Sequence, residues 1–141
     1  MRDVVFSVPG IPVGKARPRV LKSGYTYTPE KTAVYENLVK LAYGAAAGGW
    51  TYPDSAELAI RIEVYFEIPK SKSKRTQHDM ELGIIRATKK PDADNILKVI
   101  ADALNHIAYR DDAQIVYAEV SKKYARTPRT DVHLWELEEE P

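Results

Sequence analysis

The amino-acid sequence predicts a single α+β domain in which one mixed β-sheet carries two main helices. Its length of 141 residues fits one domain and allows roughly two thirds of the unfolded surface to be buried on folding. Four segments have the alternation or composition of strands, and two have apolar residues at helical spacing. Hydrophobic residues at 44% and charged residues at 29% are ordinary values for a folded chain. We therefore expect residues 1–141 to form one domain.

The first half of the chain predicts a strand, a basic loop and a helix. A β-rich run at 4–8 ends at a Pro-Gly pair, and a loop is expected over 11–27. Thr28 begins a typical helix start, in which a hydroxyl N-cap precedes a proline and an acid. Two consecutive glycines should end this helix after residue 47. The stripe expected to face the core consists of Val34, Leu38, Leu41 and Ala45.

The second half predicts three strands and a helix. Apolar and polar side chains alternate without a break over 58–68, which is the clearest strand signal. A lysine-rich connection of about twenty residues follows, and such long links are more often functional than idle. A second helix is expected over 94–106, and further strands at about 114–124 and 131–137. The inward side chains of that helix should be Leu97, Ile100, Leu104 and Ile107.

The composition excludes several kinds of chemistry. There is no cysteine, which rules out disulfides, thiolate metal ligands and a cysteine nucleophile. No run approaches the ~20 apolar residues of a membrane span, so we expect a cytoplasmic protein with no membrane partner. We also expect no nucleotide cofactor. The net charge is only +1, but bases gather at 15–22 and 70–90. This distribution predicts a basic surface beside an acidic site.

One short motif places carboxylates and a lysine where the second helix should begin. Asp92 and Asp94 flank a single alanine, and side chains two apart in an extended backbone point the same way. Asp94 is also placed to be the N-cap of the helix, and Lys98 lies one turn further on the same face. A second acidic motif contains Asp111 and Asp112. Together these residues predict a charged site at the start of the helix.

Asp112 can join this site only if the chain folds back along the helix. Residues 95–106, as a helix, carry the chain about 18 Å from Asp92 at 1.5 Å per residue. The six residues that follow span about 20 Å at most when extended. Asp112 is therefore within reach if the link turns back; otherwise a second subunit must supply it.

Three carboxylates around one site repel one another, which a hard cation relieves. Mg²⁺ suits oxygen ligands and keeps waters, one of which can attack a phosphodiester, whereas the lack of cysteine argues against zinc. Each part also has a simpler interpretation: an Asp-x-Asp pair can merely cap a helix, an Asp-Asp pair can form a turn, and Lys98 can be a solvated helix residue. Their co-occurrence with basic loops favours a metal-dependent nuclease.

These motifs resemble the signature of RusA-type Holliday junction resolvases. The resemblance is carried by the stretches 89–98, 102–105 and 109–115, together with 13–19 and 27–29, and spans roughly residues 5–125. It implies a RusA-like α+β fold. It also implies that Asp92, Asp94 and Asp112 bind the metal and that Lys98 is the catalytic lysine. Asp111 is a weaker candidate.

The resemblance further implies a substrate and an assembly. The family forms homodimers, often encoded by prophages, that bind four-way DNA junctions in recombination and repair. With Mg²⁺ or Mn²⁺ they cut two strands symmetrically, and an isologous dimer presents two identical sites to two like strands. The bases expected to hold phosphates are Lys15, Arg17, Arg19, Lys72, Lys74, Arg75, Lys89 and Lys90. The alternatives are a nuclease for other branched DNA, such as flaps or forks, and an inactive DNA-binding module.

Overall fold

The structure is a computed structural model that describes residues 2–17, 19–27 and 29–138. Its strands are β1 (Asp3–Pro9), β2 (Arg19–Val20), β3 (Thr26–Tyr27), β4 (Leu58–Glu67), β5 (Ile115–Ala125) and β6 (Arg129–Glu136). Its helices are α1 (Glu30–Ala47), α2 (Lys74–Glu81), α3 (Ala93–Leu104) and the short 3-10 helix η1 (Asp112–Gln114). None of the described helices is both long and apolar enough to cross a membrane. The predicted α+β class is confirmed.

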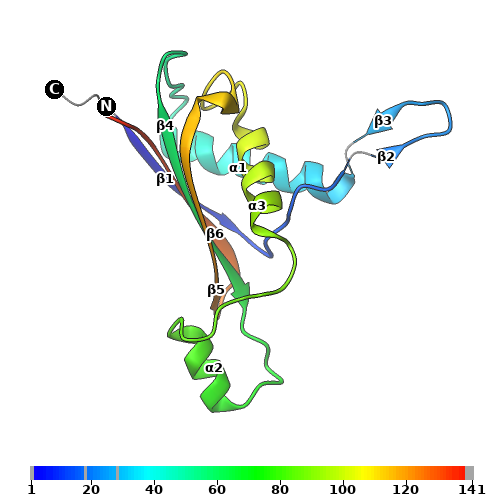
Figure 1. Cartoon of the computed structure of the whole chain (residues 1–141), viewed down its shortest axis with the longest axis vertical. Coiled ribbons are helices and arrows are strands. Elements are labelled where there is room, and N and C mark those ends of the chain that lie inside the picture. Colours follow the sequence, from blue (N-terminus) through cyan, green and yellow to red (C-terminus); the bar gives the residue numbers. More distant parts are fainter. Residues whose placement is uncertain (1, 18, 28, 139–141) are drawn as a thin grey trace.

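The four long strands form a mixed sheet in the order β1-β6-β4-β5. Strand β6 is antiparallel to both of its neighbours, whereas β5 runs parallel to β4. Parallel neighbours need a long crossover, and here the chain passes through α2 and α3 between β4 and β5. Both α1 and α3 lie on one side of the sheet (Figure 1). The crossover therefore places α3, with its acidic motif, beside the edge strand β5.

Strand β4 alternates between core and surface as predicted. Its core side chains are Leu58, Ile60, Ile62, Val64 and Phe66, all nearly inaccessible to solvent. Helix α3 packs against them through a continuous apolar face formed by Ile96, Val99, Ile100, Ala103 and Leu104. Leu97 and Ile107 are only partly buried but still contact this core. Of the inward face predicted for the second helix, Ile100 and Leu104 are confirmed as buried, Leu97 and Ile107 are only partly buried, and the buried Ile96, Val99 and Ala103 were not predicted.

The predicted core stripe of α1 was wrong. Val34 is 53% exposed and Leu41 is 71% exposed. The side chains that α1 buries are Thr32, Tyr35, Val39, Tyr43 and Ala47. The helix ends as predicted, with Gly48 in the left-handed conformation and its N–H donating to the carbonyl of Gly44. Its N-cap residue is Pro29, and the predicted cap, Thr28, lies outside the described residues.

Two tyrosines explain why the other face of α1 is buried. The Tyr35 hydroxyl donates to Oγ1 of Thr130 at 2.8 Å, and the Tyr43 hydroxyl donates to the carbonyl of Trp50 at 2.6 Å. A tyrosine ring buries a large apolar area once its hydroxyl has a partner. Burial also raises the pKa of Tyr43 to about 12. The aromatic face of α1 is therefore buried against the core, and the aliphatic stripe beside it is left exposed.

Two connecting segments contain structure that the sequence did not predict. The expected loop at 11–27 includes the β2–β3 hairpin, closed by a 2.8 Å hydrogen bond from Leu21 N–H to Tyr25 O and projecting from the body (Figure 1). The lysine-rich link after β4 contains α2, whose N-cap Ser73 accepts a hydrogen bond from Thr76 N–H. Both elements bury few apolar side chains, so hydrophobic periodicity does not reveal them.

Candidate functional site

The first two turns of α3 carry two of the predicted site residues on one face. Asp94 and Lys98, four residues apart, line a cavity of about 350 Å³ between α3 and the start of β5. Asp112, the first residue of η1, lines the same cavity. Asp94, Lys98 and Asp112 of one chain are therefore brought together.

A tight turn after α3 returns the chain to this cavity. His106 takes a positive φ of 65°, and its N–H donates to the carbonyl of Tyr109 at 2.8 Å. The buried Tyr109 donates its hydroxyl to the carbonyl of Ala101 at 2.6 Å, which fixes the turn against α3. The backbone N–H of Asp112 then donates to Oδ1 of Asn105 at 2.9 Å. The link folds back along the helix, so a second subunit is not needed to supply Asp112.

The carboxyl group of Asp112 lies among other negative charges. Its partial burial, followed by the nearby carboxyl groups of Asp111 and Asp102, raises its pKa above the ordinary value. The pKa of Asp111 is lowered, first because the backbone N–H of Ala113 donates to its Oδ1 at 2.9 Å. Crowded carboxylates hold protons more tightly when no cation offsets their charge. A divalent cation beside Asp112 would therefore replace an unfavourable interaction with a favourable one.

Asp92 lies apart from this group. Asp92 is the extended N-cap residue of α3, so the predicted cap, Asp94, is not the cap. The carboxylate of Asp92 pairs with the Lys90 ammonium at 3.0 Å. The helix already includes Ala93 and Asp94, so the two-residue alternation of extended backbone does not apply. Within the described ranges, no three histidine, aspartate or glutamate side chains are grouped closely enough to hold a metal. The predicted cluster of three carboxylates is not assembled.

The donors in the cavity nevertheless fit Mg²⁺. This ion is commonly held by one or two carboxylates while it keeps several of its waters. Asp94 and Asp112 supply such oxygens, and the cavity of about 350 Å³ has room for the waters. The raised pKa of Asp112 is the sign of negative charge that lacks a partner.

The structure gives Lys15 a different role from the predicted DNA contact. Its ammonium lies 3.1 Å from the carboxylate of Glu36 in α1 and 3.4 Å from that of Asp102 in α3. The Lys15 side chain is only 17% exposed. Its backbone N–H also donates to the carbonyl of Asn95 at 2.9 Å. Lys15 therefore joins the N-terminal segment to both long helices.

Gly14 makes that junction possible. A Cβ at this position would lie 2.7 Å from Cβ of Pro91 and 3.1 Å from Cβ of Asn95, so any larger residue would push the segment away from α3. The glycine thus allows the backbone of the N-terminal segment to lie against the start of α3.

Asp102 was missed as a residue of the site. It follows Lys98 by four positions, just as Lys98 follows Asp94, so helical spacing was the available signal. Its carboxylate lies between the ammonium of Lys15 and the carboxyl group of Asp112. Asp102 therefore connects the buried ion pair to the cavity.

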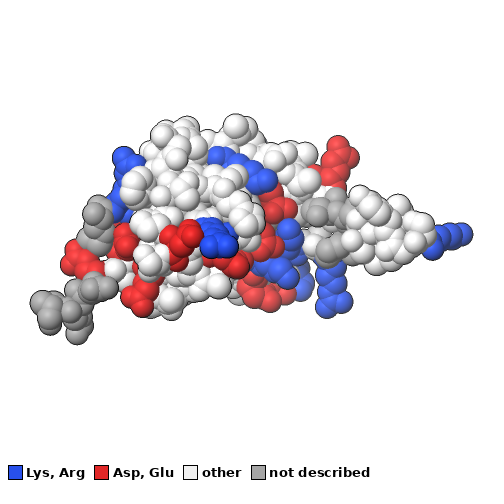
Figure 2. Space-filling view, turned by 90° about the horizontal axis from the view of Figure 1, so that it is seen from above, with Lys and Arg blue, Asp and Glu red and all other residues white. Residues whose placement is uncertain are grey.

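The other predicted bases occupy two regions. Arg17, Lys89 and Lys90 line a hollow beside the start of α3. Lys72, Lys74 and Arg75 are exposed around the start of α2. The side chain of Arg19 lies outside the described part of the chain. Figure 2 shows basic and acidic side chains interspersed over the middle of one face, so this face is not uniformly basic.

Taken together, an exposed lysine and two carboxylates in one cavity, with bases nearby, define a site suited to phosphodiester chemistry. The chain belongs to the RusA family of endodeoxyribonucleases: the family model described as "Endodeoxyribonuclease RusA" matches residues 9–135. This family consists of Holliday junction-resolving endonucleases, so the chain is an endodeoxyribonuclease, a hydrolase, by class. The resemblance seen in the sequence motifs is confirmed.

A relative in Bacillus subtilis (strain 168) is also similar over nearly its whole length. It is named "Uncharacterized protein YqaN" and is 34% identical over 145 residues, which cover 97% of this chain and 99% of that protein. The two chains therefore share the whole of the α+β fold.

Proposed function

We propose that this protein, with residues 1–141 acting as one domain, is a Mg²⁺-dependent homodimeric endonuclease that resolves four-way DNA junctions by paired symmetric nicks. The observation that carries the proposal is the meeting of Asp94, Lys98 and Asp112 in one cavity of a chain of the RusA family. Mn²⁺ is expected to substitute for Mg²⁺, because both accept oxygen ligands.

Each residue of the cavity has a distinct role in this proposal. Asp94 and Asp112 would hold the ion, and Asp92 would join them through a bound water or a small movement of its side chain away from Lys90. The ion would supply an activated water and would offset charge on the transferring phosphate. Lys98 is exposed and, among the described residues, makes no ion pair, so its ammonium is free to contact the scissile phosphate. It would stabilise negative charge that increases in the transition state.

A dimer follows from the symmetry of the substrate. A four-way junction has approximate two-fold symmetry, and an isologous pair of chains would present one cavity to each of two like strands. The exposed apolar side chains of α1, which include Val34, Leu38 and Leu41, offer a surface that a second copy would cover. Two chains per bound junction are therefore expected.

The test is cleavage of a synthetic mobile four-way junction beside a linear duplex and a replication fork. Each substrate is incubated with Mg²⁺ or with chelator, for the native chain and for Asp94→Asn. The proposal expects paired symmetric nicks on the junction that need both the metal and Asp94, while Asp94→Asn still binds the junction. Equal cleavage of all three substrates would indicate a general nuclease. Tight junction binding without any cleavage would indicate a binding module.

A further inference from the structure

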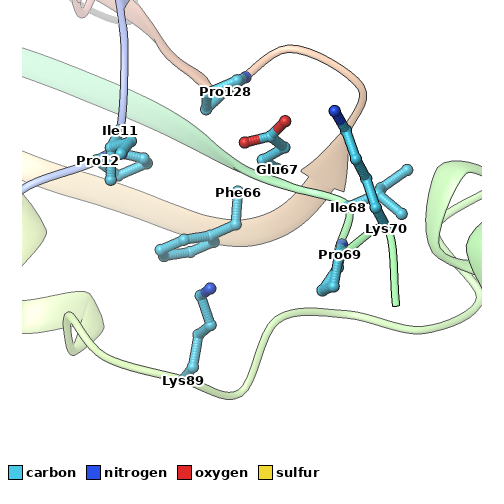
Figure 3. A pocket seen from close by; sticks show the side chains of 9 residues that line it. All are labelled: Ile11, Pro12, Phe66, Glu67, Ile68, Pro69, Lys70, Lys89 and Pro128. Carbon is cyan, nitrogen blue, oxygen red and sulfur yellow. The ribbon is translucent and has the colours of Figure 1, made fainter. Parts of the chain in front are cut away.

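Two hollows adjoin beside the start of α3. The first has a volume of about 530 Å³ and the second about 670 Å³. They share four lining residues, Ile11, Pro12, Phe66 and Lys89, so they form one continuous groove. Figure 3 shows the first hollow, with the Phe66 ring near its centre and the Lys89 ammonium turned toward that ring.

The rim of this groove is basic. Five of its lining residues are cationic, Arg17, Lys31, Lys70, Lys89 and Lys90, and its acidic residue is Glu67. Within the described part of the chain, Lys90 alone of these five makes an ion pair, with Asp92. Lys31 comes from α1, which the sequence did not connect with DNA, whereas Lys70 lies in the basic stretch at 70–90 but was not itself among the predicted phosphate contacts. The groove therefore collects positive charge that Glu67 and Asp92 offset only in part.

The floor of the groove is apolar and held in place. Phe66 is 3% exposed and belongs to the buried face of β4. The ammonium of Lys89 lies 5.3 Å from the centre of its ring, and that of Lys122 lies 5.9 Å away. Lys122 also donates to the carbonyl of Lys89 at 2.5 Å. The lysine at the middle of the groove thus has a fixed backbone.

The groove reaches the start of α3, the helix that carries Asp94 and Lys98. Pro91 lines it, Asp92 caps the helix immediately after, and Asp94 and Lys98 follow within the next two turns. Gly14 also lines it and packs directly against Pro91. A chain of phosphates bound in the groove would therefore continue toward the cavity that contains Asp112.

We propose that this groove holds the phosphodiester backbone of one duplex arm of the junction and directs it toward Asp94, Lys98 and Asp112. The inference rests on the proposed function and adds Lys31 and Lys70 as DNA-binding residues. The basic rim complements the regularly spaced phosphates of a DNA strand, and the apolar floor suits the faces of the sugars. The contacts would be with phosphates and sugars, which carry no sequence information directly.

The first test is the salt dependence of junction binding with chelator present, so that no cleavage takes place. Log affinity falls as log salt rises, and each lost phosphate contact makes this negative slope less steep by about 0.9. For Lys31→Ala combined with Lys70→Ala, the slope should become less steep by about 1.8, and the loss of affinity between 50 and 200 mM salt should be about tenfold smaller than in the native chain. Lys40→Ala, an exposed lysine of α1 outside the groove, is the matched control and should keep the native slope.

The second test uses the absence of cysteine. Ile11→Cys places a thiol in the groove at a position 69% exposed, and Val5→Cys places one on β1, away from the groove, at a position 64% exposed. Each thiol is alkylated with a photoactivatable aryl azide and irradiated with bound junction. Cross-linking from position 11 and not from position 5 is expected.

These outcomes separate the two proposals. A native slope for the double variant, or equal cross-linking from both positions, would overturn the groove while leaving the nuclease proposal intact. A native chain that does not bind the junction at all would overturn the proposed function. A reduced slope together with cross-linking from position 11 alone would establish the groove even in a chain that does not cleave.

Discussion

Lys15 and Lys98 both lie beside acidic side chains near the same cavity, but only Lys15 is held in ion pairs among the residues that the structure describes. Lys15 is 17% exposed and already contacts two carboxylates, those of Glu36 and Asp102. Lys98 is exposed and lines the cavity with Asp94 and Asp112. In the sequence both lysines look equally suited to hold a phosphate. Their difference shows that the partners already present around a charge, rather than the charge itself, decide whether it can bind a ligand.

The largest effect should come from removing the exposed lysine. Lys98→Met is expected to reduce junction cleavage by about 10²–10³-fold, the usual loss when one group that stabilises transition-state charge is removed. Thermal stability should stay near the native value because the side chain is exposed and makes no ion pair with any residue that the structure describes. Single-turnover cleavage and a melting curve measure the two quantities. Native cleavage by the variant would remove Lys98 from the proposed chemistry.

A smaller effect of a different kind is expected at Lys15. Lys15→Met leaves two partly buried carboxylates without their cation, which should destabilise the fold by about 1–2 kcal/mol, or roughly 3–8 °C in melting temperature. Junction affinity in chelator should remain native, because the ammonium is not available to DNA. In the double variant with Glu36→Gln, part of the loss should be recovered, since one unpaired charge is gone. Weaker DNA binding at native stability would restore Lys15 to the DNA surface.

The smallest effect concerns the carboxyl group of Asp112, which lines the same cavity as Lys98. The pKa of Asp112 is raised in the folded state, so the metal-free fold binds a proton more tightly than the unfolded chain. Its stability should therefore fall as the pH rises above the ordinary value of 3.8. At pH 7 the metal-free Asp112→Asn variant should melt slightly higher than the native chain, by about 2 °C, and the difference should vanish in strong acid.

The same variant also tests metal binding without any cleavage assay. Added Mg²⁺ should raise the melting temperature of the native chain, because the ion binds the folded state, and should leave Asp112→Asn unchanged. An equal rise in both proteins would place the ion elsewhere.

Much of the fold follows from local patterns. The alternation in β4 was predicted because the pattern is unambiguous and the strand is long, and the same kind of pattern located α3 and two of its buried residues, Ile100 and Leu104. The face of α1 was mistaken because two stripes compete on that helix. Tyr35 is buried with Thr130, on a distant strand, as its hydrogen-bond partner, and Tyr43 with the carbonyl of Trp50, just beyond the end of the helix. Side-chain hydrogen bonds of this kind are invisible to a periodicity argument.

In the candidate site, too, some features follow from the sequence and others from the tertiary structure. The sequence by itself determined the residue types, the family motif and the one-turn spacing that puts Asp94 and Lys98 on the same face, because these are properties of neighbouring residues. Only the tertiary structure decided that Asp112 returns to Asp94 within one chain and that Lys15 is paired with Glu36 and Asp102. These depend on distances between segments far apart in the sequence, which are set by how the helices pack on the sheet.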